Sequence, residues 1–254
     1  SILPRLNKRI VTYGIEFAQA KYQARNIEFS NLSSIADIYR TGERIGSLSL
    51  GIPGRHNIAN ALAAIATAES LAIDVEISTK ALASFRGAER RSQVIGEING
   101  ILVMDDYAHH PTEVEATLKA LRSGYPNRRI LAAFQPHTFT RTRDFADAFG
   151  AAFAEYADGL YLAEIYPARE KPIEGITSKL ILDAATSNGL KKAVLLTAID
   201  ELPGFILRDA KAGDIVVTLG AGSITEQAPI ILQVLKASAS EKTPSKRTRS
   251  MEKV

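Results

Sequence analysis

Residues 130–163 read ILAAFQPHTFTRTRDFADAFGAAFAEYADGLYLA, and this stretch decides the fold. Its two ends, residues 130–134 and 159–163, are short apolar runs, as expected for strands buried on both faces of a sheet. Between them, residues 144–156 repeat apolar side chains at helical spacing. A strand, a helix and a second strand in this order form the unit from which parallel sheets are built.

The same alternation continues in both directions along the chain. We expect further strands at 101–104, 193–196 and 214–219, and further helices at 113–121, 178–186, 199–209 and 224–236. Pro111 suits the first turn of a helix because its fixed φ is already helical. Repeated alternation predicts the α/β class, with a mostly parallel sheet covered by helices on both faces.

The first 90 residues have a different pattern. Runs rich in β-branched and aromatic residues predict short strands at 9–14, 21–29, 35–40 and 45–50. The segment Gly51-Ile52-Pro53-Gly54 interrupts this pattern. An alanine-rich helix is expected at 57–72, and a second helix at 78–85 with Ser78 or Thr79 as its N-cap. The polar strands indicate a peripheral antiparallel piece rather than an independent domain.

The composition excludes several classes of protein. Of the 254 residues, 46% are hydrophobic and 23% are charged, which is typical of a soluble globular protein. The absence of cysteine excludes disulfide scaffolds, thiol nucleophiles and cysteine-based metal sites. No apolar run is long enough to predict a transmembrane helix, and the first residues lack the pattern of a signal peptide.

The positive charge is concentrated at the C-terminus. From position 236 onward there are six basic and two acidic residues, a local charge of +4. The whole chain has a net charge of +3, so the first 235 residues sum to −1. We expect residues 237–254 to form a disordered basic tail. Such a tail can contact nucleic acid or an acidic membrane, but this one has no aromatic residue for stacking on bases. We therefore expect neither partner.

Ligands of parallel sheets bind beyond the C-terminal ends of the strands, and two polar segments lie at such positions. DDYAHHP (105–111) follows one strand, and QPHTFTRTR (135–143) follows another. Carboxylates accept hydrogen bonds from ribose hydroxyls, imidazoles transfer protons, and guanidinium groups bind carboxylates or phosphates. A capped turn and a solvated loop are the simpler interpretations. The density of such groups favours a functional site.

Other segments leave more than one interpretation open. The turn GAGS (220–223) follows a predicted strand and could approach a phosphate or simply be tight. Asn57 and Asn60 share one helix face, although Asn57 could instead cap the helix. His109, His110 and Asp106 lack a further ligand at a spacing suited to zinc. A serine hydrolase is not supported, since no G-x-S-x-G motif occurs.

Six segments together resemble the Mur ligase family. They are GRHNIANALAA (54–64), FRGAERR (85–91), DDYAHHPTEV (105–114), FQPHTFTRTRDF (134–145), EIYPAREKPI (164–173) and GDIVVTLGAGSI (213–224). The resemblance covers residues 1 to about 236 and is greatest to the members that add L-alanine. It implies a cytoplasmic, ATP- and Mg²⁺-dependent ligase of peptidoglycan precursor synthesis, with UDP-N-acetylmuramate and L-alanine as substrates.

The resemblance also implies a reaction and a division of labour. In the family, ATP converts the muramyl carboxylate to an acyl phosphate, and the amine of the amino acid then displaces phosphate. The residues whose positions match nucleotide contacts are His56, Asn57 and Asn60 for adenine, Arg91 for the phosphates and Asp106 for the ribose.

A second group of residues matches the wall where the amino acid meets the muramyl end. Its members are Tyr107, His109, His137 and Arg141, with Arg141 expected to bind the alanine carboxylate. The catalytic residues implied by the resemblance are Arg91, His109 and His137. Thr138 stands where some family members carry arginine, so one substrate contact of the family is not carried over.

One family motif is missing from the chain. The P-loop pattern G-x-x-x-x-G-K-[ST] does not occur, because Gly is nowhere followed by Lys. By resemblance, residues 1–87 are the C-terminal remnant of an α/β P-loop ATPase domain, and residues 88–236 are a Rossmann-like C-terminal domain. We expect the P-loop, the main Mg²⁺ ligands and the UDP-binding domain to precede Ser1.

Two hypotheses for the function follow. In the first, the chain is the C-terminal part of an L-alanine-adding ligase and is inactive without the missing N-terminal domains. In the alternative, it is a stand-alone, non-catalytic module that binds a nucleotide or an amino acid. A nucleic-acid-binding protein, based on the basic tail alone, is the weakest interpretation.

Overall fold

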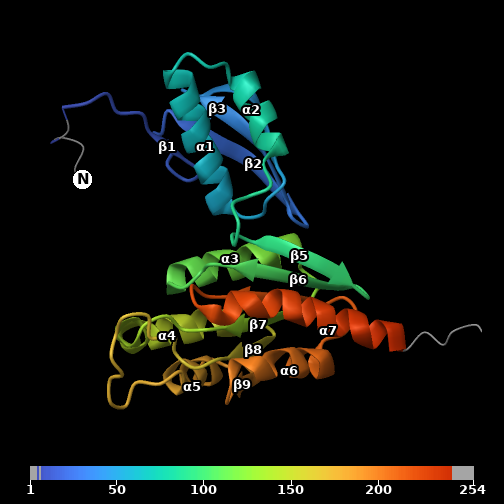
Figure 1. Cartoon of the computed structure of the whole chain (residues 1–254). Helices are drawn as coiled ribbons and strands as arrows, with labels where there is room; N and C mark the ends of the chain where they lie inside the picture. The colour runs from blue at the N-terminus through green and yellow to red at the C-terminus, as the bar shows by residue number, and fades with distance from the viewer. Residues whose placement is uncertain (1–4, 6, 242–254) are drawn as a thin grey trace, which may run out of the picture. The chain divides into compact units, whose positions relative to one another are not determined.

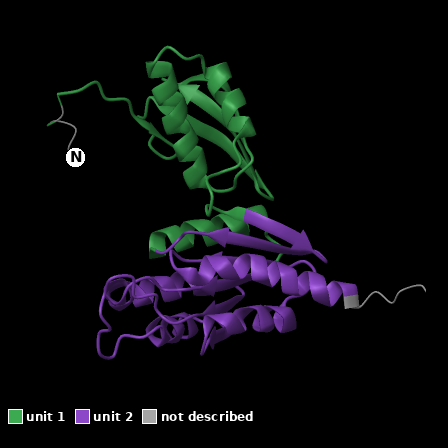
Figure 2. Ribbon diagram, in the orientation of Figure 1, with its two compact units in different colours: residues 1–93, 110–128 green, residues 94–109, 129–254 purple. Residues whose placement is uncertain are grey.

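The computed structural model describes residues 5 and 7–241 and divides into two compact units (Figure 2). Unit 1 comprises residues 1–93 and 110–128, and unit 2 comprises residues 94–109 and 129–254. No helix of the described residues is long and apolar enough to cross a bilayer. The predicted tail at 237–254 is helical as far as Glu241, and the rest of it lies outside the described residues.

Unit 1 contains a four-stranded sheet with helices packed on it (Figure 1). The strands are β1 (Tyr13–Gly14), β2 (Tyr22–Ser30), β3 (Ser33–Arg40) and β4 (Glu43–Leu50), in that spatial order. β1 pairs parallel to β2, whereas β2, β3 and β4 form an antiparallel meander. Helix α1 (Arg55–Ser70) packs against β1 and β2, and α2 (Val75–Ser84) packs against β4.

The helices of unit 1 begin earlier than the sequence predicts. α1 starts at Arg55 behind the N-cap Gly54, whose φ of 102° lies in the left-handed region that glycine tolerates. The cap of α2 is Asp74, which accepts a hydrogen bond from the Glu76 amide, so the prediction of Ser78 or Thr79 was wrong. A third helix, α3 (Pro111–Gly124), also belongs to unit 1, and Pro111 occupies its first turn as expected.

Unit 2 contains a six-stranded sheet with the spatial order β5-β6-β10-β7-β8-β9. The strands are β5 (Gln93–Ile98), β6 (Ile101–Asp106), β7 (Ile130–Phe134), β8 (Gly159–Leu162), β9 (Ala193–Leu195) and β10 (Ile215–Leu219). From β6 to β9 every pairing is parallel. The mostly parallel sheet predicted from the sequence is therefore confirmed, with β10 inserted between β6 and β7.

Helices cover both faces of this sheet. Val103, Ala133 and Val216 pack on one face against α6 (Leu202–Asp209) and α7 (Gln227–Glu241). Phe134 points to the opposite face, as neighbouring residues in a strand must, and contacts Phe149 of α4 (Phe139–Tyr156). α5 (Lys179–Ser187) packs beside α4. The short 3₁₀ turns Ile199–Glu201 and Ser223–Glu226 precede α6 and α7.

Two boundaries differ from the prediction in ways that affect the candidate site. α4 begins at Phe139 rather than at 144, which moves Arg141 and Arg143 from a loop into its first turns. The predicted helix at 224–236 is divided into a 3₁₀ turn and α7.

Candidate functional site

Three loops meet where β6, β10 and β7 end. Leu219, the last residue of β10, is in register with Asp106 on one side and with Phe134 on the other. Beyond this point, the Gly220 amide donates to the Asp106 carbonyl (3.1 Å) and the Gln135 amide donates to the Leu219 carbonyl (3.1 Å). Both polar segments singled out in the sequence therefore lie at one edge of one sheet.

The GAGS turn is accounted for by close packing. A Cβ on Gly222 would lie 2.4 Å from Oε1 of Gln135 and 2.8 Å from Cγ of Tyr166, and Gly220 has a φ of +145°. The Gln135 side-chain oxygen also accepts a hydrogen bond from the Ile224 amide (3.1 Å). These contacts require small residues at both positions without involving a phosphate, which supports the interpretation as a tight structural turn.

The adjacent carboxylates at the end of β6 have different environments. Asp105 is 1% exposed and accepts hydrogen bonds from the hydroxyls of Thr218 (2.6 Å) and Thr225 (2.8 Å). Asp106 is 2% exposed, and its Oδ1 accepts a hydrogen bond from the Ala108 amide (2.8 Å). Asp105 thus ties β6 to β10 and the turn after it, while Asp106 shapes the loop that carries Tyr107 and His109.

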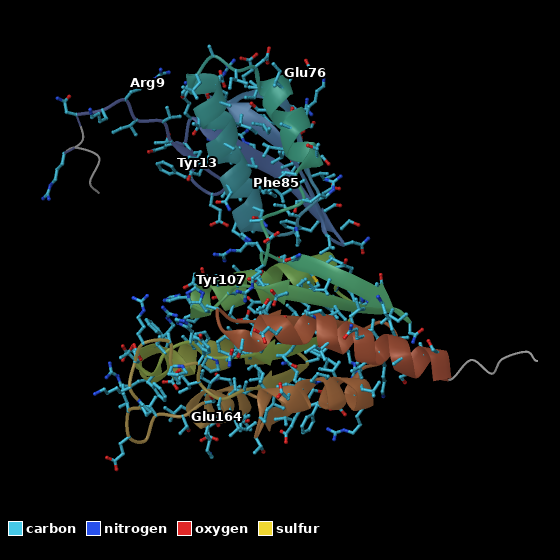
Figure 3. The ribbon with its side chains drawn as sticks, in the orientation of Figure 1. Arg9, Tyr13, Glu76, Phe85, Tyr107 and Glu164 are labelled. Carbon is cyan, nitrogen blue, oxygen red and sulfur yellow. The ribbon has the colours of Figure 1, made fainter. Side chains whose placement is uncertain are left out.

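Four rings form a continuous row at this edge. Centroids are 5.0 Å apart for Tyr107 and His109, 5.7 Å for His109 and His137, and 5.7 Å for His137 and Tyr166, the last pair nearly parallel. Tyr107, which begins the row, is labelled in Figure 3. Tyr166 was not predicted from the sequence, because only tertiary pairing brings its segment beside His137.

The neutral rings of His109 and His137 carry their protons on different nitrogens. Nδ1 of His109 lies 2.9 Å from the Tyr107 carbonyl, which can only accept, so the proton of the neutral ring is on Nδ1 and the lone pair is on Nε2. Nδ1 of His137 lies 3.4 Å from a guanidinium nitrogen of Arg141, which can only donate. Neutral His137 therefore carries its proton on Nε2.

His137 is neutral over a wider pH range than an exposed histidine. Burial lowers the pKa of its imidazole, and the positive charges of Arg141 and His109 lower it further, against an opposing effect of Glu170. Arg141 itself is half-buried, and in the described part of the chain it forms no ion pair with a carboxylate. Its guanidinium is thus positioned to bind an anion from outside the protein.

The remaining predicted site residues lie in unit 1. His56, Asn57 and Asn60 are on the first turns of α1, and the Asn57 side-chain amide donates to the Pro53 carbonyl (2.7 Å) rather than capping the helix. Arg91 is exposed and lies 3.5 Å from the Glu113 carboxylate.

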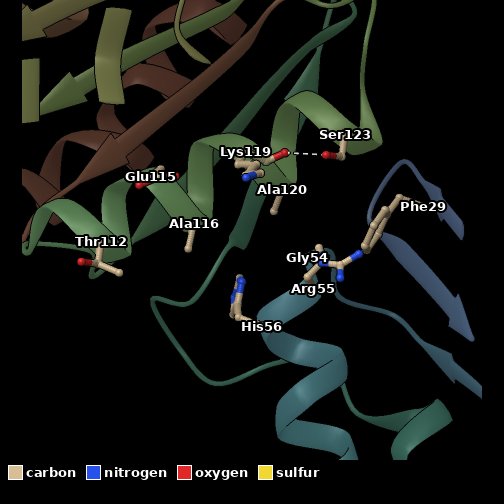
Figure 4. A pocket seen from close by; sticks show the side chains of 10 residues that line it. All are labelled: Phe29, Gly54, Arg55, His56, Thr112, Glu115, Ala116, Lys119, Ala120 and Ser123. Carbon is tan, nitrogen blue, oxygen red and sulfur yellow. Dashed lines mark hydrogen bonds between the residues drawn. The ribbon is translucent and has the colours of Figure 1, made fainter. Parts of the chain in front are cut away.

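A cavity of about 260 Å³ in unit 1 contains one of these residues (Figure 4). His56 and Arg55 line it from the start of α1, and Thr112, Glu115 and Lys119 line it from α3. Asn57 and Asn60 are not among its lining residues. His56, Asn57 and Asn60 nevertheless remain neighbours within the first two turns of α1.

No group of three or more histidine, aspartate or glutamate side chains could hold a metal ion among the residues that the structure describes. His109, His110 and Asp106 do not converge on a common centre of that kind.

Two family models match the chain. The model of the Mur ligase glutamate ligase domain matches residues 90–222, and that of the Mur ligase middle domain matches residues 2–68. The chain belongs to the Mur ligase family, which confirms the resemblance inferred from its motifs.

Relatives of one kind recur among the most similar proteins. The UDP-N-acetylmuramate–L-alanine ligases of Sorangium cellulosum and Geobacter sulfurreducens are 40% and 42% identical to this chain over 96% and 92% of its length. The crystal structure of the corresponding Thermotoga maritima enzyme has a TM-score of 0.77 at 29% identity, over 90% of this chain and 48% of that one. The chain spans about half the length of these curated relatives.

A murein peptide ligase from Psychrobacter arcticus is more distant, with a TM-score of 0.59 and 26% identity over 89% of this chain and 46% of that one. A Thermotoga maritima MurF ligase solved in complex with ADP is 18% identical, with a TM-score of 0.67, and covers 95% of this chain and 51% of that one. At this identity the likeness establishes the shared fold alone.

Proposed function

We propose that this chain is the C-terminal part of an ATP-dependent ligase that joins L-alanine to UDP-N-acetylmuramate. The observation that carries the proposal is the half-buried Arg141, bonded to His137 and without a carboxylate partner in the described residues, at the C-terminal edge of the sheet. A free amino acid presents a carboxylate that a guanidinium binds in a bidentate manner. The identity to L-alanine-adding relatives over most of the chain supports this substrate.

Arg141 and three residues of the ring row have proposed roles. Arg141 binds the alanine carboxylate, and Tyr107 and His137 form the wall beside it. The lone pair on Nε2 of His109 accepts a proton as the alanine amine attacks. His137, kept neutral by its lowered pKa, donates from Nε2 to an oxygen of the muramyl end. These groups thus hold the amino acid and take up its proton.

The nucleotide contacts are a separate part of the proposal. Asp106 would accept a ribose hydroxyl, since a carboxylate can accept hydrogen bonds beyond the one from Ala108. His56, Asn57 and Asn60 would face adenine, and Arg91 would meet the phosphates. ATP would supply phosphoryl transfer to the muramyl carboxylate, releasing ADP, after which the amine displaces phosphate. The ligands of Mg²⁺ would come mainly from the part of the protein outside this chain.

We also propose a domain boundary near residue 87. Residues 1–87 would complete the central ATPase domain and residues 88–236 the C-terminal domain, consistent with family models matching 2–68 and 90–222. This boundary leaves α3 in the C-terminal domain, although α3 belongs to compact unit 1.

The first test is the coding sequence immediately upstream of Ser1. An in-frame extension through a Gly-Lys-Thr or Gly-Lys-Ser P-loop supports the ligase. A stop codon followed by a start signal would reduce the chain to a binding module.

Activity is the second test. Chain 1–254 alone should release no ADP in response to L-alanine, because it lacks the phosphate cradle. The complete protein should do so only when UDP-N-acetylmuramate is present. Alanine-dependent ADP release by the chain alone would contradict the proposal.

A further inference from the structure

The loop between β8 and α5 is joined to the start of α4 by backbone pairing. Tyr166 forms an isolated parallel bridge with His137. The Tyr166 amide donates to the Pro136 carbonyl (2.8 Å), and the Thr138 amide donates to the Tyr166 carbonyl (2.9 Å). The loop therefore runs beside the segment that carries His137.

Glu170, four residues further along this loop, makes a second attachment. Its carboxylate accepts hydrogen bonds from the hydroxyl and from the backbone amide of Thr140 (2.9 Å for the amide). These two bonds are the main cause that holds the pKa of the Glu170 carboxyl below its usual range. Two donors of Thr140 thus meet on one carboxylate.

The geometry differs from ordinary helix capping. Thr138 already caps α4, its hydroxyl oxygen accepting from the Arg141 amide, and its φ of 70° is a strained backbone conformation for a residue other than glycine. Glu170 comes from a segment 30 residues away and satisfies another amide of the same turn, that of Thr140. It therefore acts as a cross-link that holds a strained turn in place.

Arg141 lies on this turn, and His137 precedes it directly. The groups that face the His137 ring are Arg141 from α4, His109 from the loop after β6, and Tyr166 and Glu170 from the β8–α5 loop. We propose that Glu170 is a positioning residue, whose carboxylate fixes the first turn of α4 so that Arg141 and His137 keep their mutual orientation. The relevance of this orientation to L-alanine rests on the proposed function.

The experiment uses NMR on the whole chain, which has four histidines and therefore few imidazole signals to assign. Three variants are compared with the wild type: Glu170→Gln, Glu170→Asp, and the matched control Glu174→Gln, an exposed glutamate of the same loop. The probes are the Thr140 amide proton, the Arg141 Nε–H signal and the pH titration of His137.

In the wild type, the Thr140 amide proton should shift with pH as the Glu170 carboxyl titrates. Glu170→Gln should abolish this titration, move the Arg141 Nε–H signal and lower the pKa of His137, because a negative charge near the ring is lost. Glu170→Asp keeps the charge but shortens the reach, so it should move the Thr140 and Arg141 signals as well. Glu174→Gln should change none of the three probes.

Two results would overturn the proposal. The first is a chemical shift of the Thr140 amide proton that does not change with pH as the Glu170 carboxyl titrates. The second is an Arg141 signal that stays unchanged in Glu170→Gln and Glu170→Asp, since the carboxylate would then hold the loop without positioning the arginine.

Kinetics of the complete ligase separate this proposal from the proposed function. Glu170→Gln should raise KM for L-alanine about tenfold with a smaller change in kcat, because misplacement of a positioning group weakens the fit of the bound substrate. If the wild-type ligase shows no L-alanine-dependent ADP release, the proposed function is refuted. The NMR probes would still decide whether Glu170 positions Arg141.

Discussion

The two edges of the sheet in unit 2 differ in whether an arginine is paired with a carboxylate. At the N-terminal edge, before β7 and β10, Arg129 makes two hydrogen bonds to the carboxylate of Asp214 (2.9 and 2.6 Å), whose side chain is 4% exposed. At the C-terminal edge, the guanidinium of Arg141 bonds only an imidazole among the described residues, and no carboxylate neutralises it.

A second cluster at the N-terminal edge strengthens the contrast. Asp209 accepts from Arg208, Lys192 and the hydroxyl of Tyr161, which hold its pKa far below the usual range. Burial and this carboxylate raise the pKa of Tyr161. Charges that neutralise one another serve stability, whereas a cation without a partner keeps its binding capacity for a ligand. The contrast therefore supports the proposed site at the C-terminal edge.

The largest expected effect concerns the unpaired edge. Arg141→Gln should lower kcat/KM of the complete ligase by about 100-fold or more, the range for loss of one charge-stabilising donor. The free energy of unfolding of the chain should change by less than about 0.5 kcal/mol. Steady-state kinetics with varied L-alanine and urea unfolding measure the two quantities. Arg143→Gln, on the exposed side of the same helix, is the control; equal losses in both variants would remove the contrast.

The paired edge should respond in the opposite manner. Arg129→Ala leaves the carboxylate of Asp214 buried without its cation and should lower the free energy of unfolding by about 2 kcal/mol. Activity of the complete ligase should be unchanged, because this edge is remote from the C-terminal ends of the strands. Urea unfolding and the ADP-release assay measure both. A loss of activity without a loss of stability would reverse the assignment of the two edges.

An intermediate effect is expected in the pH dependence of stability. Because the pKa of His137 is lowered in the folded chain, the folded state binds fewer protons than the unfolded state below about pH 6.5. The free energy of unfolding should therefore fall as the pH decreases through this range. Arg141→Gln removes one cause of the lowered pKa, so it should raise the pKa of His137 and make this decrease shallower. Histidine NMR and urea unfolding at several pH values test this, and a steeper decrease would contradict it.

The smallest effect is expected for charge pairs that belong to neither edge. Lys179 and Asp183 pair across one turn of α5, with side chains 63% and 54% exposed. Lys179→Ala should change the free energy of unfolding by no more than about 0.5 kcal/mol, because solvent screens such pairs. A loss comparable with that of Arg129→Ala would show that burial is not what distinguishes the paired edge.

Prediction from the sequence succeeded where burial is uniform. Strand β7 has the predicted limits, since a parallel strand buried on both faces is a continuous apolar run. Strand β5 was not predicted, because its residues are exposed or only partly buried and show no such run. The start of α4 was predicted too late, because the contact that holds its first turn is distant in the sequence. Glu170, which bonds the Thr140 amide, lies in the loop after the next strand.

The residues of the candidate site likewise fall into those that could be identified from the sequence and those that could not. Tyr107, His109, His137 and Arg141 were identifiable because they follow predicted strands, and the structure brings them together. Tyr166 and Glu170 were not identifiable as partners, since their contacts depend on how the β8–α5 loop returns to α4. The individual roles assigned to these residues stay predictions.

The position of β10 has a consequence for how this protein is made. Among the described residues β10 is the last strand in sequence, but it lies inside its sheet, where it separates β6 from β7. During synthesis, both of those strands must wait with an unpaired edge until residues 215–219 leave the ribosome. Such late, long-range pairing slows folding and exposes strand edges to association with other chains. A nascent chain that stops before residue 215 would therefore be a substrate for chaperones rather than a shorter, folded protein.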